Sequence, residues 1–186
     1  VFWGLDLGHP TSIQAHASDH SPLAAPKSSI ITYQFPARGD MPPVKVKWYD
    51  GGNMPPRPEE LEEGRRMGDR DGGCIFIGDK GKLMCGCYGK NPRIIPETKM
   101  KDYNRPPKTI PRSKGHYKDW LIACKGGKPA SSNFDYAGPL TEVVLLANIA
   151  LRAGEKIEWD GPNMKVTNLP EANAYVRRLY RGGWSI

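Results

Sequence analysis

The sequence predicts an α+β protein with an open, largely antiparallel or mixed β-sheet and helices packed on one face. Segments of alternating polar and apolar residues fill the first half of the chain, and segments with helical spacing fill the second half. Strands that come first and helices that follow are typical of this class. The 186 residues, 38% of them hydrophobic, suffice for one well-buried domain or at most two small ones.

The chain opens with residues 1–7, which look like the end of a helix closed by glycine and proline. Five segments after them alternate as strands do. The strands are then expected at Thr11–Ser18, Ser29–Phe35, Val44–Tyr49, Cys74–Ile77 and Leu83–Cys87. Gly78-Asp79-Lys80-Gly81 is a tight-turn sequence between the last two, so they form a hairpin with one covered face. Cys85 and Cys87 are expected on the same face of this hairpin as small hydrophobes.

The first predicted helix carries an apolar stripe at i, i+3, i+4 and i+7, formed by Tyr117, Trp120, Leu121 and Cys124. Gly126-Gly127 ends it, because glycine takes the left-handed C-cap conformation without steric cost.

The second helix is predicted to begin at Pro139, since a first helical position needs no amide donor. Its body, Leu140–Leu151, is apolar on nearly every side and should be covered on most of its circumference. Gly154 stops it, and Lys156–Trp159 alternates as a strand. Asn168 and Glu171 then resemble a capping box that opens a third helix.

Two segments, residues 50–72 and 89–114, are rich in proline and charge and are predicted to lack regular structure. Long loops of this kind are either solvated connections or segments that arch over a pocket or a neighbouring subunit.

Composition argues against several classes of function. The net charge of +7 is spread over loops without an aromatic-studded basic stripe, so nucleic acid is not an expected partner. The chain has no apolar run near the ~20 residues that span a bilayer, so no membrane is expected. The four cysteines lack Cys-x-x-Cys spacing, which argues against structural zinc. His16, Asp19 and His20 imitate a metal cluster, but a polar strand end explains them equally well.

Four stretches together resemble the Gfo/Idh/MocA oxidoreductases, which include glucose–fructose oxidoreductases and inositol dehydrogenases. They are the hairpin Gly72–Gly89, the helix start Gly115–Trp120, the strand Ile157–Asp160 and the ending Tyr180-Arg181-Gly182-Gly183-Trp184. The similarity covers essentially all 186 residues, but only as the C-terminal domain of a bacterial branch of that family.

The resemblance implies a single domain, residues 1–186, that binds substrate and forms a dimer or tetramer through its sheet. An N-terminal Rossmann domain that binds NAD or NADP would lie outside this chain, as would the Glu-Lys-Pro lysine and the catalytic histidine of the family. The chain has no Gly-x-Gly-x-x-Gly, so it is expected to bind no cofactor and to be inactive alone. The parent enzyme would be a dehydrogenase of sugars, polyols or their derivatives. It would be cytoplasmic, or periplasmic if a twin-arginine signal preceded it.

Candidate substrate-binding residues lie in two places. His116 begins a helix and faces the same side as Asp119, a carboxylate that could fix its tautomer, while Tyr117 is its companion unless it packs in the core. Tyr49 and Asp50 end a strand, where a ring and a carboxylate suit a sugar, although a turn Asp-Gly explains them as well. No catalytic residue and no metal ligand is assigned.

Two other functions remain open at this point. One is a stand-alone binding or scaffold module that kept the sheet without the chemistry. The other is an NAD-dependent enzyme of the same family that cleaves glycosides or epimerises sugars, because hydride transfer is the first step in all of these reactions.

Overall fold

The computed structural model describes residues 1–19, 21, 24–177 and 179–184. The chain packs as two compact units, one of Val1–Met54 with Ser113–Ile186 and the other of Pro55–Arg112. The assignment of all 186 residues to one C-terminal domain stays a prediction. The α+β class with antiparallel sheets is confirmed.

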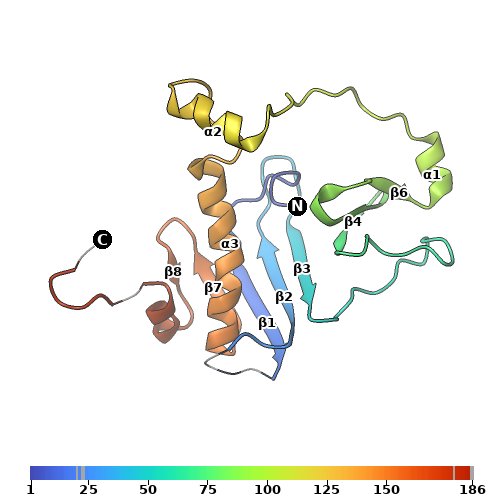
Figure 1. Ribbon diagram of the computed structural model, residues 1–186. Coiled ribbons are helices and arrows are strands. Elements are labelled where there is room, and N and C mark those ends of the chain that lie inside the picture. Colours follow the sequence, from blue (N-terminus) through green and yellow to red (C-terminus); the bar gives the residue numbers. More distant parts are fainter. Residues whose placement is uncertain (20, 22–23, 178, 185–186) are drawn as a thin grey trace. The chain divides into compact units, whose positions relative to one another are not determined.

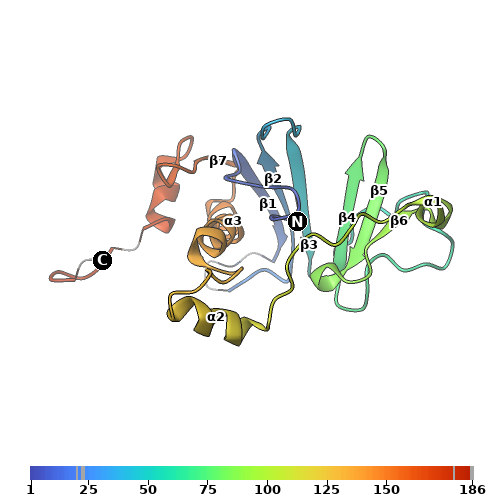
Figure 2. The same ribbon diagram turned by 90° about the horizontal axis from the view of Figure 1, so that it is seen from above.

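The first unit is built on an antiparallel sheet with one long helix on one of its faces (Figure 1). In sheet order its strands are β3 (Val44–Asp50), β2 (Ser28–Phe35), β1 (Ser12–Ser18), β7 (Ile157–Asp160) and β8 (Lys165–Val166). The helix is α3 (Phe134–Ala153), which packs on β1 and β7 and lies on one side of the sheet in Figure 2. The predicted strands are thus confirmed to within one or two residues.

Alternation along β2 determines which face of this sheet is buried. Ile31, Tyr33 and Phe35 point to α3 and are buried, and they pack with Ile13 of β1 and Ile157 of β7. The opposite face carries mainly polar side chains from paired positions of three strands, which are Gln14, His16, Ile30, Thr32, Gln34, Lys45, Lys47 and Tyr49. A face of this composition has little need of apolar cover.

The second unit contains the predicted hairpin and a third strand. Its elements are β4 (Gly73–Gly78), β5 (Gly81–Gly86), a short 3-10 turn η1 (Cys87–Gly89), β6 (Arg93–Ile95) and α1 (Glu97–Asp102). Leu61, Met84 and Ile95 form its small core. The prediction that residues 89–114 lack regular structure is therefore wrong for β6 and α1, because Ile94 and Ile95 pair with β5.

Cys85 and Cys87 do not share a strand face. The strand ends at Gly86, since the carboxylate of Asp69 accepts a hydrogen bond from the amide of Cys87 at 3.0 Å and the chain turns there. A Cβ on Gly86 would lie 2.3 Å from Asp69 Oδ2, so glycine is required for this approach.

The helix α3 begins five residues before the predicted start. Asn133 caps it by accepting a hydrogen bond from the amide of Tyr136, and Pro139 lies inside the helix, where the carbonyl of Asp135 loses its usual donor. The prediction that this helix is covered on most of its circumference is also wrong, because Val144 and Leu145 are exposed while Leu146 and Ala150 are buried. Gly154 ends the helix in the left-handed conformation, as predicted.

By length and composition alone, α3 could cross a membrane, and it is the one helix among the described residues of which this is true. The core helix of a soluble protein passes the same test. Two observations favour a core helix here: Ala147 and Ala150 belong to the core built on the sheet, and Glu142 bonds with residues before β1 and in β7.

The remaining predicted elements differ in extent or in cover. α2 (His116–Cys124) ends before Gly126 as expected, but its apolar stripe is exposed. The predicted third helix is a 3-10 turn, η2 (Pro170–Tyr175), with Leu179 beyond it 96% exposed. Asn168 does not cap η2, because its side chain bonds to Glu158 and Lys156. Residues 2–6 form turns rather than an assigned helix.

Candidate functional site

Three side chains from distant segments of the first unit meet in one polar cluster. The carboxylate of Glu142, on α3, has its Oε1 2.8 Å from His9 Nδ1 and accepts a hydrogen bond from the indole nitrogen of Trp159 at 2.8 Å. Trp159 is buried, the Glu142 side chain is 15% exposed and the His9 side chain is 41% exposed. The cluster therefore extends from the core, at Trp159, to the solvent, at His9.

Each member is held by local structure. Trp159 lies in β7, and its amide donates to the carbonyl of Thr11 at 3.0 Å. His9 lies between Gly8 and Pro10, just before β1. Gly161 makes room for the imidazole, because a Cβ there would lie only 2.1 Å from His9 Cγ. This absence of a side chain at residue 161 allows the ring to lie against the strand end.

The arrangement prepares His9 for contact with a polar ligand. A carboxylate that already accepts from Trp159 acts as acceptor for His9 Nδ1–H, which leaves Nε2 as the other ring nitrogen. An imidazole held in this way by a carboxylate can accept a hydroxyl proton or a hydrogen bond. Glu142 Oε2 makes no hydrogen bond to any residue that the structure describes, so it is a second acceptor.

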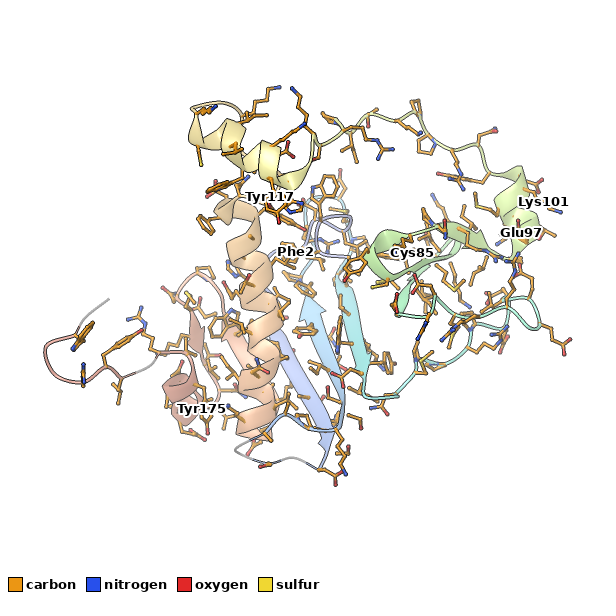
Figure 3. All side chains as sticks on the ribbon, in the orientation of Figure 1. Phe2, Cys85, Glu97, Lys101, Tyr117 and Tyr175 are labelled. Atoms are coloured by element: carbon orange, nitrogen blue, oxygen red, sulfur yellow. The ribbon has the colours of Figure 1, made fainter. Side chains whose placement is uncertain are left out.

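The predicted pair of His116 and Asp119 is not formed. Asp119 accepts hydrogen bonds from the Ser113 hydroxyl and the Lys114 amide, so its carboxylate ties the segment before α2 to the first turn of the helix. The ring of His116 instead lies 4.2 Å, centroid to centroid, from that of Tyr117. Figure 3 labels Tyr117, which is 75% exposed and does not pack in the core. Both rings remain accessible to a ligand.

Tyr49 and Asp50 are adjacent in β3 but point to opposite faces of the sheet. Asp50 Oδ1 accepts from the amide of Ser29 at 3.1 Å and so joins the ends of β2 and β3. Tyr49 pairs with Ile30, which pairs with His16 on the open face. Among the described residues, no hydrogen bond or ring contact joins either of these residues to His116 or Tyr117.

The structure also places the histidines and cysteines that sequence patterns singled out. Asp19 Oδ2 lies 3.5 Å from Lys27 Nζ, and His20 lies outside the described residues. No group of three metal-ligating side chains occurs in the described part of the chain. The cysteines there are free, and burial, with the neighbouring Cys85 thiol, raises the pKa of the Cys74 thiol. That thiol is therefore a poor nucleophile.

His9 has no recognisable motif, and sequence reasoning missed it. Its partner is 133 residues away, and no spacing rule relates the two. The nearest signals are an isolated glutamate in an apolar helix and a glycine directly after a strand.

The chain was compared with protein-family models and with curated proteins. No family model and no curated protein matches it.

Proposed function

We propose that this chain is the substrate-binding and oligomerisation domain of an NAD(P)-dependent oxidoreductase that acts on sugars, polyols or their derivatives. Two features together support this most: an open antiparallel sheet with α3 on one face, and a histidine that the partly buried carboxylate of Glu142 holds at the edge of that sheet. The resemblance to Gfo/Idh/MocA oxidoreductases implies the same architecture.

The part of the chain that the structure describes contains no strand and helix arranged as in a dinucleotide-binding fold. Phosphate cradles for dinucleotides lie between a parallel strand and the N-terminus of the helix that follows it, whereas the described strands pair antiparallel. The sequence also lacks Gly-x-Gly-x-x-Gly. In this proposal the chain contributes substrate contacts and self-association, and the hydride chemistry belongs to residues elsewhere in the enzyme.

Within the proposal, His9 is the first contact for a substrate hydroxyl, because the carboxylate of Glu142 holds its ring in place. Polyols are recognised by such fixed polar groups. Three other rings compete with His9 as substrate contacts, and the position of each is compatible with stacking on a sugar. They are the rings of His116, Tyr117 and Tyr49.

Ligand-observed NMR with inositol, glucose and NAD⁺ tests this proposal on the wild type, His9→Ala and His116→Ala. We expect saturable binding of a polyol, at least tenfold weaker in His9→Ala and unchanged in His116→Ala, and no saturable binding of NAD⁺. Tight nucleotide binding, or no binding of any polyol, would sink the proposal. Loss only in His116→Ala would move the site to α2.

A stand-alone binding or scaffold module is the second candidate, and the antiparallel pairing of the described strands is compatible with it. Sequencing the DNA upstream of the Val1 codon separates the two. An open frame that encodes Gly-x-Gly-x-x-Gly and Glu-Lys-Pro supports the oxidoreductase, and a start codon immediately before Val1 supports the module. Light scattering at micromolar concentration tests self-association, and a monomer mass would contradict the predicted dimer or tetramer.

A further inference from the structure

A cavity of about 230 Å³ lies within the second unit, and its lining is strongly cationic. Four basic side chains and one carboxylate line it, together with glycines, Met84, Cys85 and Asn91; these charged residues are Arg65, Arg66, Lys90, Arg93 and Asp69. Met84 and Cys85 are buried and form an apolar floor, whereas Arg66 and Lys90 are exposed at the rim. The cavity thus combines a closed floor with a positive rim.

The single carboxylate of the lining is already occupied by backbone donors. Asp69 Oδ1 accepts from the amide of Asp71 at 2.9 Å, and Oδ2 accepts from the amide of Cys87 at 3.0 Å. Asp69 holds its own loop together with these bonds and makes no ion pair in the described part of the chain. Carboxylates outside the lining pair with two of its cations, since Arg93 bonds to Glu62 and Arg65 Nη2 lies 3.6 Å from Glu97 Oε2, so the uncompensated charge is that of Arg66 and Lys90.

Arg93 is held rigidly and has donors to spare. Its Nη2 donates to both carboxylate oxygens of Glu62, at 2.9 and 2.8 Å, and lies 3.1 Å from Glu97 Oε2. Nη1 makes no hydrogen bond to a described residue and is the nitrogen left for a ligand, whereas Nε is buried, lacks a partner and is closed to solvent. Figure 3 labels Glu97 on α1 and Cys85 on β5, within this unit. A guanidinium fixed in this way presents charge to a ligand at little entropic cost.

The two rim cations make no ion pair in the part of the chain that the structure describes. Neither Arg66 nor Lys90 lies within 4.0 Å of a carboxylate oxygen of any described residue. Lys90 follows Tyr88 and Gly89, which both have positive φ, and its ammonium lies 5.8 Å from the centre of the Tyr88 ring. Repulsion between uncompensated cations around one cavity is relieved by an anion.

We propose that this cavity binds a tetrahedral oxyanion, either free phosphate or the phosphate group of a small ester. Arg and Lys side chains are the usual partners of such groups, and an arginine fork matches their geometry. The site is independent of the proposed polyol contact at His9, because all of its residues lie between Arg65 and Arg93.

Titration calorimetry with inorganic phosphate and with glucose 6-phosphate, at ionic strength held constant with NaCl, tests the site. The variant is the double substitution Arg66→Gln and Lys90→Gln. The matched control is Lys80→Gln with Lys101→Gln, which removes the same charge from exposed positions outside the cavity. Both pairs are exposed, so both variants should fold.

We expect the cavity variant to bind at least tenfold more weakly and the control to bind as the wild type does. Tighter binding of glucose 6-phosphate than of inorganic phosphate identifies an ester as the natural ligand, and equal binding identifies the free oxyanion. Absence of binding by the wild type at 20 mM, or equal losses in both variants, would overturn the proposal.

Discussion

His9 Nδ1 and Glu142 Oε1 lie 2.8 Å apart although 133 residues separate them in the chain. The contact ties the segment before β1 to the middle of α3, and Trp159 of β7 shares the same oxygen. One partly buried carboxylate thus connects the helix to two places on the sheet. This explains why a single acidic residue is present in an otherwise apolar stretch of helix.

Removing this carboxylate should destabilise the protein. In Glu142→Ala the buried indole nitrogen of Trp159 loses its acceptor, and an unsatisfied buried donor costs about 1–3 kcal/mol. Urea denaturation followed by tryptophan fluorescence measures the loss. The control is Glu155→Ala, an exposed position after the helix, which should change the free energy of unfolding by less than about 0.5 kcal/mol. Equal effects of the two substitutions would show that the cluster contributes nothing to stability.

Adding one methyl group beside His9 should have a similar effect. Gly161→Ala places a Cβ 2.1 Å from His9 Cγ and 2.4 Å from His9 Cβ, so rotation of the imidazole ring alone does not relieve the clash. We expect a loss of about 1–3 kcal/mol from overpacking. The double variant Gly161→Ala with His9→Gly removes the side-chain atoms that the new methyl group would meet, so its loss of stability should be smaller than the sum of the two single losses. Strict additivity in denaturation experiments would contradict the geometry.

The strands were predictable because their patterns are local. Alternation along β1, β2 and β3, and the glycines at the ends of the β4–β5 turn, place these elements to within one or two residues. The start of α3 was not predictable from local patterns. Pro139 is the strongest local signal for a helix start, but the helix begins five residues earlier, at Phe134, where Asn133 caps it.

The candidate site was harder to predict because it depends on contacts between distant segments. An apolar stripe on α2 predicts a helix, but it does not say whether another element covers Tyr117 and Trp120, and in this chain none does among the described residues. Likewise, Asn168 is a residue type that commonly caps helices, but its side chain makes hydrogen bonds to Glu158 in β7 and to Lys156 just before that strand. His9 becomes informative only once Glu142 is known to lie beside it.

Tyr33 should make stability depend on pH in the alkaline range. Burial raises the pKa of its hydroxyl from 10.0 to about 12. Because the folded state holds this proton more tightly, the stabilisation is complete below pH 10 and is lost as the pH rises from 10 towards 12. Urea denaturation at pH 9 to 11.5 should show a steeper decline for the wild type than for Tyr33→Phe. The exposed control, Tyr117→Phe, should decline as the wild type does; a decline in Tyr33→Phe as steep as in the wild type would contradict this assignment.

Glu62 should determine part of the acid limit of the second unit. The amide of Glu97, which donates to this carboxylate, and then Arg93 hold the pKa of Glu62 below its usual value of 4.5. A lowered pKa means that the folded state binds the proton less tightly. The stabilisation is therefore present above about pH 4.5 and is lost as the pH falls through the lower folded value. Lys82 lowers the pKa of Glu60 in the same way, so both carboxylates act in one pH window.

The test of this acid limb compares Glu62→Gln with its exposed neighbour, Glu63→Gln. At pH 7, Glu62→Gln should lower the melting temperature by a few degrees, because the amide replaces a charged acceptor for Arg93. The deficit should shrink as the pH falls below 4.5, since the wild type then loses the same charge. Thermal melts followed by circular dichroism from pH 3 to 7 measure it. A deficit that stays constant over this range would mean that the stabilisation by Glu62 does not depend on its charge. Convergence of the wild-type and Glu62→Gln melting temperatures at low pH would identify the charge as the cause.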